Sequence, residues 1–343
     1  MQDFRRLGTG ASGLANCGNT CYLNAIIQAL VHCPPVNAFL DAGNYRVRLK
    51  REQREAGNLL VEFDKVRILL WLRDHSVMPK GFVASLLTKV KQSGMIEFGE
   101  GNQCDAHEFL VFLFDAFHTA ISRQVDMVVA GSPKTDRDEL AKKCYTHLKN
   151  QYNSQWSEFI QMFSIISFDA ITCPQSGVSL STAVDCSSIL SLPLCDSTPT
   201  LLALLDRYTA SERMSGENAW HDEDNGGYRE VNRCSFFWSL PDVFIIHLVR
   251  WGIDLRKNRT SIDFPITELD MCPYVHGYRP DDYKYRLSAV CYHHGSPAGG
   301  HYSACAKSLR GAWLHYNDRV VREVSGDAIC SQDAYLLFYS KIK

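Results

Sequence analysis

The order of the predicted elements indicates an α+β fold, with helices first and strands later. Apolar residues recur at helical spacing in the first third of the chain, up to about residue 117. From about residue 163 the pattern changes to short apolar runs separated by Pro, Gly, Ser and Asp, which is typical of strands and turns. Because helices and strands are segregated along the chain, the pattern favours α+β over α/β.

Three amphipathic helices are expected in the first third. Asn19-Thr20 offers an N-cap for the first helix, and Pro34-Pro35 stops it. The second helix covers 59–70, and the third begins near Asn102. Their apolar faces are, in order, Leu23, Ile26, Ile27 and Leu30; Leu59, Leu60, Phe63, Val66 and Leu70; and Phe109, Leu110, Leu113 and Phe117. The charged run 46–55 is interpreted as a solvated face, and 132–155 as a surface excursion.

The second half of the chain is predicted to contain an antiparallel meander. Residues 243–249 are all apolar except for His247, which is typical of a buried strand. Further strands are expected at 285–292, 301–307, 312–317 and 335–339.

Composition limits the classes of partner and compartment. The chain has 343 residues with 36 Lys+Arg against 38 Asp+Glu, a formal charge of −2, which gives no reason to expect nucleic acid or a membrane surface. No apolar run approaches the ~20 residues that cross a bilayer, and the first residues have no apolar stretch typical of a secretory signal. The 13 cysteines are therefore expected as free thiols in an intracellular, cytoplasmic or nuclear compartment.

Cys21 is the first candidate for chemistry. It follows Gly18-Asn19-Thr20 and so falls in the first turn of the predicted helix, where the helix dipole and unpaired amides favour a thiolate. A thiol with a lowered pKa is a nucleophile when a base is within reach. Taken alone, a small buried cysteine is the commoner interpretation.

His301 is the candidate base. It follows Gly299-Gly300 and opens a predicted strand. A turn centred on Leu309 would place Asn317 directly opposite His301, about 5 Å away across the ladder. Asn317 would then orient the imidazole as the third member of a Cys-His-Asn triad.

Two further polar residues complete the predicted site. Asn16 precedes Cys21 by five residues, so its amide could reach a developing oxyanion together with the Cys21 backbone N–H. A turn residue is the alternative for Asn16. Asp318 follows Asn317 and could assist it or substitute for it.

These residues lie within segments that resemble the ubiquitin-specific proteases, which are papain-like deubiquitinating enzymes. The segment from Gly13 to Gln28 resembles the Cys box of this family, and residues 300–305 and 313–321 resemble its His box. Residues 102–110, 240–250 and 334–339 are similar to three further family segments. The segments follow the family order and cover nearly the whole chain.

The resemblance implies a single catalytic domain at 13–340. A helical thumb would cover about 13–120, the fingers about 160–240 and the palm about 241–340. It also implies that Cys21 is the nucleophile, His301 the general base and acid, Asn317 the residue that orients His301, and Asn16 an oxyanion donor. No cofactor is required.

Four residues are implied to bind the substrate. At the positions of Asp105 and Glu108 the family uses acidic residues to contact the basic tail of ubiquitin, and an acidic pair at i, i+3 on one helix face is suited to arginine. A solvated helix edge is the alternative. Gly299 and Gly300 are interpreted as the lining of a narrow channel for a tail that ends in Gly-Gly.

The sequence departs from the family at the fingertips, where many members hold zinc with two Cys-x-x-Cys pairs. Here those positions read Cys173, Ser176, His221 and Asp224, which is a poor donor set for zinc. We therefore expect no metal. The acidic run 222–227 is interpreted as a fingertip loop. His293 and His294 are expected in a loop beside the cleft, without a catalytic role.

The expected activity is a thiol protease that cleaves after the C-terminal glycine of ubiquitin. Two alternatives stay open: a catalytically silent ubiquitin-binding module, and a protease for a related modifier that also ends in Gly-Gly. We expect ubiquitin and ubiquitinated proteins as partners, no nucleic acid, no membrane and a monomeric chain.

Overall fold

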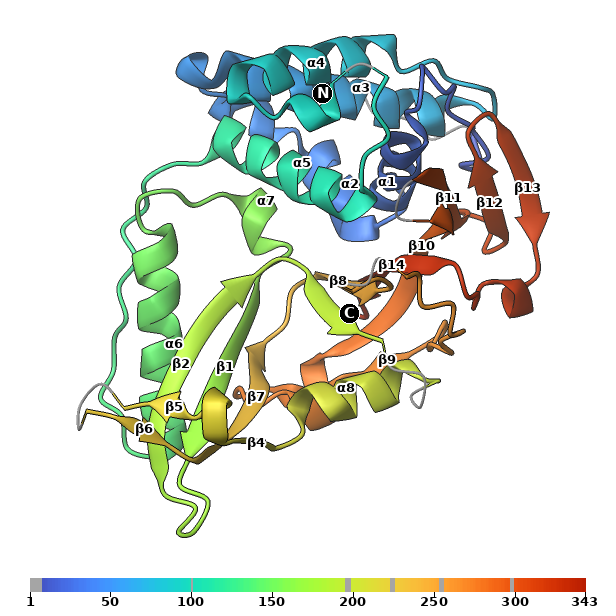
Figure 1. Cartoon of the computed structure of the whole chain (residues 1–343). Coiled ribbons are helices and arrows are strands. Elements are labelled where there is room, and N and C mark those ends of the chain that lie inside the picture. The colour runs from blue at the N-terminus through green and yellow to red at the C-terminus, as the bar shows by residue number, and fades with distance from the viewer. Residues whose placement is uncertain (1–7, 100, 195–198, 223–225, 253–255, 297–298) are drawn as a thin grey trace.

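The helices of the N-terminal third pack together on one side of the molecule, and the later strands form sheets beneath them (Figure 1). This computed structural model describes residues 8–343 except 100, 195–198, 223–225, 253–255 and 297–298. The helices are α1 (Cys21–Val31), α2 (Pro34–Ala42), α3 (Arg54–Leu72), α4 (Lys80–Ser93), α5 (Ala106–Ile121), α6 (Asp136–Tyr152), α7 (Glu158–Gln161) and α8 (Leu201–Thr209). The strands are β1 (Ile165–Thr172), β2 (Ser179–Ser187), β3 (Leu190–Pro193), β4 (Glu212–Met214), β5 (Trp220–His221), β6 (Tyr228–Arg229), β7 (Val231–Ser239), β8 (Val243–Val249), β9 (Leu269–Asp270), β10 (Lys284–Ser296), β11 (Gly299–Lys307), β12 (Trp313–Asn317), β13 (Val320–Val324) and β14 (Ala334–Lys341).

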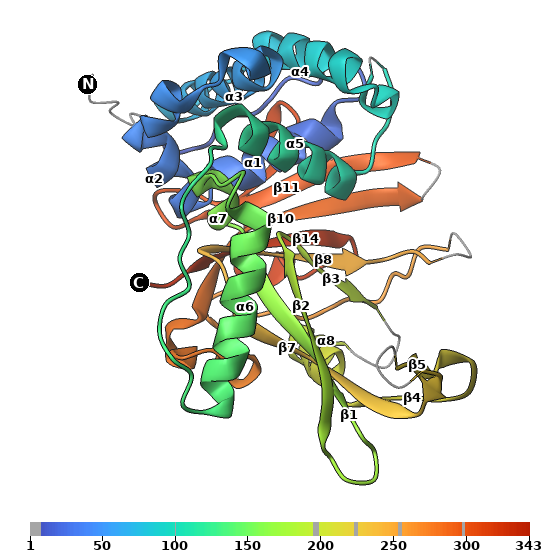
Figure 2. The same ribbon diagram turned by 90° about the vertical axis from the view of Figure 1, so that its left-hand side faces the viewer.

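The main sheet has the strand order β13-β12-β11-β10-β14-β8-β3, and β9 pairs with β10. Its pairings are antiparallel except for β3 with β8. A second sheet has the order β2-β1-β7-β4, and its long β1–β2 hairpin extends away from the N-terminal helices, with α6 packed beside it (Figure 2). The predicted α+β class is confirmed, and so is the antiparallel meander for the strands expected at 285–292, 301–307 and 312–317. The strand expected at 335–339 lies in β14, which does not continue the meander and pairs with β10 and β8 instead.

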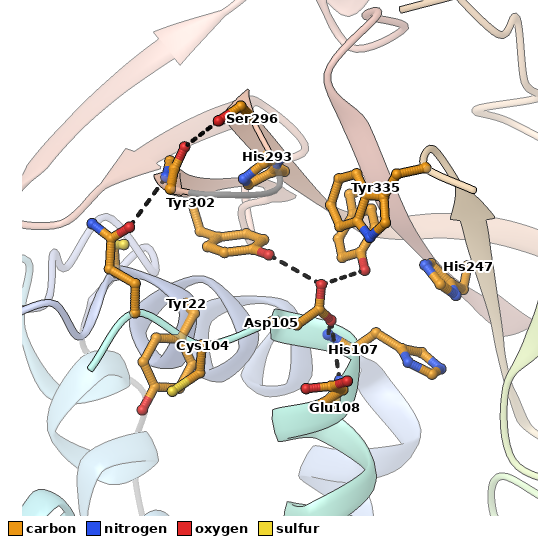
Figure 3. A pocket seen from close by; sticks show the side chains of 15 residues that line it. Tyr22, Cys104, Asp105, His107, Glu108, His247, His293, Ser296, Tyr302 and Tyr335 are labelled. Atoms are coloured by element: carbon orange, nitrogen blue, oxygen red, sulfur yellow. Dashed lines mark hydrogen bonds between the residues drawn. The ribbon is translucent and has the colours of Figure 1, made fainter. Parts of the chain in front are cut away.

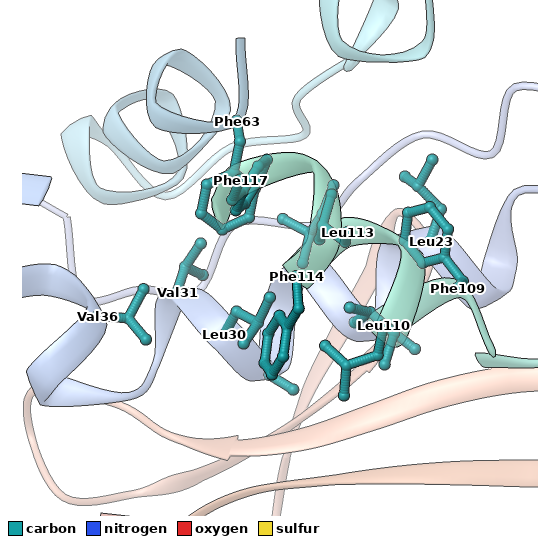
Figure 4. Close-up of a cluster of buried hydrophobic side chains, with 14 of the residues drawn as sticks. Leu23, Leu30, Val31, Val36, Phe63, Phe109, Leu110, Leu113, Phe114 and Phe117 are labelled. Carbon is teal, nitrogen blue, oxygen red and sulfur yellow. The ribbon is translucent and has the colours of Figure 1, made fainter. Parts of the chain in front are cut away.

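Helix α1 is the centre of the core that positions the site. All 11 of its residues are buried, because α5 covers one side of the helix and strands β10 and β11 pack against the other. Figure 4 shows Leu23 and Leu30 of α1 beside Phe109, Leu110 and Phe114 of α5. The apolar faces predicted for the three helices are all buried.

The structure differs from the sequence-based predictions in three places. The segment interpreted as a surface excursion contains α6, which begins with a capping box between Thr135 and Asp138 and buries Ala141 and Cys144. The helix α4 was not predicted, because its lysines interrupt the apolar pattern. Thr20 occupies the N-cap position of α1, yet its hydroxyl accepts from the Cys17 N–H and caps no helical amide.

No single helix in the described parts of the chain is long and apolar enough to cross a membrane. The α1–α2 pair passes the length and composition test only together, with an 80° bend.

Candidate active site

Cys21 begins α1 and is 5% exposed. Burial raises the pKa of its thiol, the backbone N–H of Tyr302 opposes this, and the Asp318 carboxylate raises the pKa further. The lowered pKa expected from the helix dipole is therefore wrong for this structure. Desolvation outweighs the helix N-terminus here, because the whole helix is buried.

His301 and Asn317 form a hydrogen bond between Nε2 and Oδ1 at 2.7 Å. The predicted register is nevertheless wrong by two residues, because Ala304 pairs with Tyr316 and Lys307 with Trp313. The connecting turn is centred one residue later than expected, and Gly311 adopts φ +84° within it. Asn317 therefore approaches His301 diagonally, which is within reach of side chains on neighbouring strands.

The Cys21 thiol forms no hydrogen bond with His301 in the part of the chain that the structure describes. The ring nitrogen that Asn317 does not engage is Nδ1. It is the atom suited to exchange a proton with Cys21 when the two side chains approach.

Asn16 and Asp318 lie together in a hydrogen-bonded network. Asn16 Nδ2 donates to Asp318 Oδ2 at 2.9 Å, while Asn16 Oδ1 accepts from the N–H groups of Gly18 and Thr20, both at 3.1 Å. The other carboxylate oxygen of Asp318 accepts from Asn24 Nδ2 at 2.8 Å. The Asp318 carboxylate thus contacts Asn16 and not His301, so a role beside Asn317 on the imidazole has no support in this geometry.

Asp105 is the N-cap of α5 and is fully engaged by the protein itself. Its Oδ1 accepts from the N–H groups of His107 and Glu108, and its Oδ2 accepts from the Tyr335 and Tyr302 hydroxyls at 2.7 and 3.4 Å (Figure 3). Glu108 is exposed overall. The pKa of its carboxyl group is nevertheless raised, first by partial desolvation and then by the negative charges of Asp105 and Glu97. Glu108 is therefore the acidic side chain that is accessible to a cationic partner.

Gly299 and Gly300 line the same cavity as Cys21, Asp105 and Glu108. A Cβ at Gly300 would come within 2.4 Å of His293 Nε2 and 2.5 Å of the His294 carbonyl oxygen, so glycine is required here by the protein's own packing. A Cβ at Gly299 would meet only Gln103 Oε1, at 3.1 Å. The channel interpretation therefore applies more directly to Gly299.

The cavity has a volume of about 310 Å³ and contains three histidines that the sequence analysis gave no role. His107 of α5 stacks on His247 of β8 at 4.3 Å between ring centroids, and His293 lies 4.8 Å from the Tyr302 ring. Burial lowers the pKa of His247 to about 3 and that of His293 to about 4. The position of His247 within the apolar run 243–249 was the sequence feature that could have indicated a buried histidine.

His293 and His294 both lie in β10 and not in a loop, so that expectation is wrong. His294 bonds through Nδ1 to Asp333 and through Nε2 to Ser303, each at 3.1 Å.

At the predicted fingertips, Cys173 and Ser176 lie in the β1–β2 turn, and His221 lies in β5. Within the described residues no group of three or more His, Cys, Asp or Glu side chains is arranged to hold a metal. Asp224, the fourth residue of the proposed set, and the centre of the acidic run lie outside the described residues. The expected absence of a metal stays a prediction.

An α+β architecture with a cysteine at the start of a core helix, and with a His–Asn pair on the strands packed against that helix, is the arrangement of papain-like cysteine proteases. Residues 12–339 match the family model "Ubiquitin carboxyl-terminal hydrolase". The chain therefore belongs to this family, as the resemblance had implied.

Individual relatives agree with this assignment. The chain is 30% identical to ubiquitin carboxyl-terminal hydrolase 2 of Gallus gallus over 348 residues, which cover 96% of this chain and 93% of the chicken protein. It is 28% identical to the Bos taurus protein of the same name, and it spans about half of that protein's length (55%). Among solved structures, the SAGA Ubp8/Sgf11/Sus1/Sgf73 DUB module bound to ubiquitin aldehyde has the same fold, with a TM-score of 0.74 and 23% identity over 100% of this chain and 71% of that one.

Proposed function

We propose that this protein is a thiol deubiquitinase that hydrolyses the peptide or isopeptide bond after the C-terminal glycine of ubiquitin. The observation that carries the proposal is the 2.7 Å His301–Asn317 hydrogen bond on the strands that pack against the helix begun by Cys21. Family membership and the ubiquitin aldehyde held by the structural neighbour support ubiquitin as the substrate.

In the proposed reaction, Cys21 Sγ attacks the carbonyl carbon of the terminal glycine. Because the thiol pKa is raised, the thiol must lose its proton during the attack, and His301 Nδ1 takes it. His301 then protonates the leaving amine, which departs and leaves a thioester on Cys21. Water, deprotonated by His301, attacks the thioester, which releases the ubiquitin carboxylate and restores the thiol.

The remaining site residues support this sequence. Asn317 accepts from His301 Nε2–H and thereby holds the imidazole in the tautomer with its lone pair on Nδ1. Asn16 donates one N–H to Asp318 and has a second N–H to offer to the oxyanion. Glu108 is the proposed contact for the basic residues of the ubiquitin tail, and Gly299 lines the path of the tail.

The parts of the fold have proposed counterparts in the family. The helical unit around α1, α3 and α5 would act as the thumb, the main sheet as the palm, and the β1–β2 hairpin sheet as the fingers. The SAGA neighbour is an assembly of four named proteins, so the expectation of a monomer stays a prediction.

The test is turnover of ubiquitin that carries a fluorogenic amide at its C-terminus. We expect wild type to release the fluorophore and Cys21→Ala to release none. Cys17→Ala is the matched control, because Cys17 precedes the helix by four residues and we expect full activity from it. Binding of ubiquitin without turnover would contradict the proposal in favour of a silent binding module, and turnover of only another Gly-Gly modifier would contradict ubiquitin as the substrate.

A further inference from the structure

Asn24 lies in α1 three residues after Cys21 and is 3% exposed. Its Nδ2 donates to Asp318 Oδ1 at 2.8 Å, and its Oδ1 is buried without a hydrogen-bond partner in the described structure. A buried carbonyl oxygen without a partner costs stability, and an apolar side chain of similar size would avoid that cost. Packing therefore does not explain an asparagine at this position of the helix.

Asp318, which Asn24 contacts, joins three parts of the proposed site. It follows Asn317 directly in the β12–β13 turn, and it adopts φ +50°, a conformation uncommon for residues other than glycine. Its backbone carbonyl accepts from the Leu14 N–H at 2.9 Å, and its Oδ2 accepts from Asn16 at 2.9 Å. The turn, the loop that carries Asn16 and helix α1 thus meet at one residue.

The orientation of the Asn16 amide depends on this carboxylate. A carboxylate oxygen such as Asp318 Oδ2 can only accept hydrogen bonds, so Asn16 must turn its NH₂ group toward Asp318. The Oδ1 atom of Asn16 then faces the N–H groups of Gly18 and Thr20. Asn24 engages the second carboxylate oxygen, so the carboxylate is held from both sides. Loss of either amide would leave Asp318 able to rotate.

We infer that Asn24 is a positioning residue that holds Asp318 so that Asp318 orients the Asn16 amide toward the oxyanion. The inference rests on the proposed function. Asn24 does not touch the reacting atoms and acts through the other two side chains. It also ties the first turn of α1 to the hairpin that carries Asn317.

The sharpest test is Asn24→Asp, which keeps the size and shape of the side chain and removes the donor. Near neutral pH two carboxylates would face each other, so Asp318 would be displaced. At lower pH the pair would share one proton, and the new carboxyl group could again donate to Asp318. Two titratable groups are linked to this position: Asp318, which accepts from Asn24, and Cys21 on the same helix, whose thiol pKa the Asp318 carboxylate raises. Both are common to variant and wild type.

We expect kcat of Asn24→Asp to be about tenfold below wild type at pH 8, with KM for the ubiquitin amide changed less than about twofold. The ratio of variant to wild-type kcat should rise toward one as the pH is lowered to about 5.5. A constant ratio, or a loss seen only in KM, would overturn the inference.

A double-mutant cycle gives a second measurement. If Asn24 acts through Asp318 on Asn16, Asn24→Leu should reduce kcat in wild type and have little further effect in Asn16→Ala. Additive losses would overturn the inference. Gln28→Met is the matched control, because Gln28 is a buried amide one turn further along α1 that donates to the Ser12 carbonyl and not to Asp318. Wild type is assayed first, so an inactive wild type would count against the proposed function and not against the role of Asn24.

Discussion

At the scale of single residues, the environment of Cys21 decides how the site begins its chemistry. Burial and the Asp318 carboxylate both raise the thiol pKa, while the Tyr302 N–H lowers it. The pKa of the Cys21 thiol is thus higher than its position at a helix N-terminus suggested. A base is needed, and His301 is the candidate that the fold supplies.

The contribution of Asp318 to this pKa can be measured. Asp318→Asn removes the negative charge while keeping the side-chain size, so the pKa of the Cys21 thiol should fall. The rate of alkylation of Cys21 by iodoacetamide, followed by peptide mass against pH, should reach half its maximum at a lower pH than in wild type. An unchanged or raised midpoint would contradict this electrostatic assignment.

Substitutions at Asp105 and Glu108 should have different effects, with Asp105 needed for stability and Glu108 for ubiquitin binding. Asp105→Ala removes an N-cap and leaves the buried Tyr335 hydroxyl without its acceptor, so the free energy of unfolding should fall by about 2 to 4 kcal/mol. Glu108→Ala, at an exposed position one turn later, should change it by less than about 0.5 kcal/mol and should weaken ubiquitin binding. Urea denaturation and a binding titration measure the two effects. Equal stability of the two variants would refute this division.

At the scale of elements, the β10–β11 hairpin shows that glycine occurs at two adjacent positions for different structural reasons. A Cβ at Gly300 would clash with the His293 ring and the His294 backbone across the hairpin, whereas a Cβ at Gly299 would meet only the Gln103 side chain. The hairpin carries His301, so its packing sets the position of the candidate base.

Alanine at the two glycines should therefore give different results. Gly300→Ala forces the strands or the His293 ring apart and should cost about 1 to 3 kcal/mol of unfolding free energy. Gly299→Ala should leave the stability nearly unchanged and affect turnover only through the path of the substrate tail. Thermal denaturation together with the fluorogenic assay checks the pair, and a stable Gly300→Ala protein would show that the predicted clash is absent.

At the scale of the whole molecule, buried histidines make stability depend on pH. His247 and His293 have folded pKa values of about 3 and about 4, both below the usual 6.5. Below pH 6.5 the unfolded chain binds protons that the folded protein excludes, so stability should be full above this pH and fall as the pH is lowered toward 4. Each histidine contributes a slope of at most about 1.4 kcal/mol per pH unit.

Urea denaturation at a series of pH values between 4.5 and 7 tests this dependence. His247→Gln should reduce the slope, and His147→Gln, a partly exposed residue of α6, is the control. A slope unaffected by the His247 substitution would mean that this histidine takes up its proton without unfolding.

Local patterns predicted the elements well where the apolar period was strong. The faces of α1, α3 and α5 and the strands of the meander follow from spacing alone. The diagonal contact of Asn317 with His301 did not, because the turn around Gly311 shifts the register by two residues. The Asn24–Asp318 contact joins residues 294 positions apart, and the two tyrosine hydroxyls that donate to Asp105 come from β11 and β14, so no local pattern could indicate these contacts.

The most direct measurement for the central claim is the reaction of the protein with ubiquitin that carries a thiol-reactive electrophile at its C-terminus, read by intact mass. We predict one ubiquitin adduct on wild type, located at Cys21 by peptide mapping, and none on Cys21→Ala. An adduct on another cysteine, or no adduct under conditions where ubiquitin binds, would contradict the assignment of Cys21 as the nucleophile of a deubiquitinase.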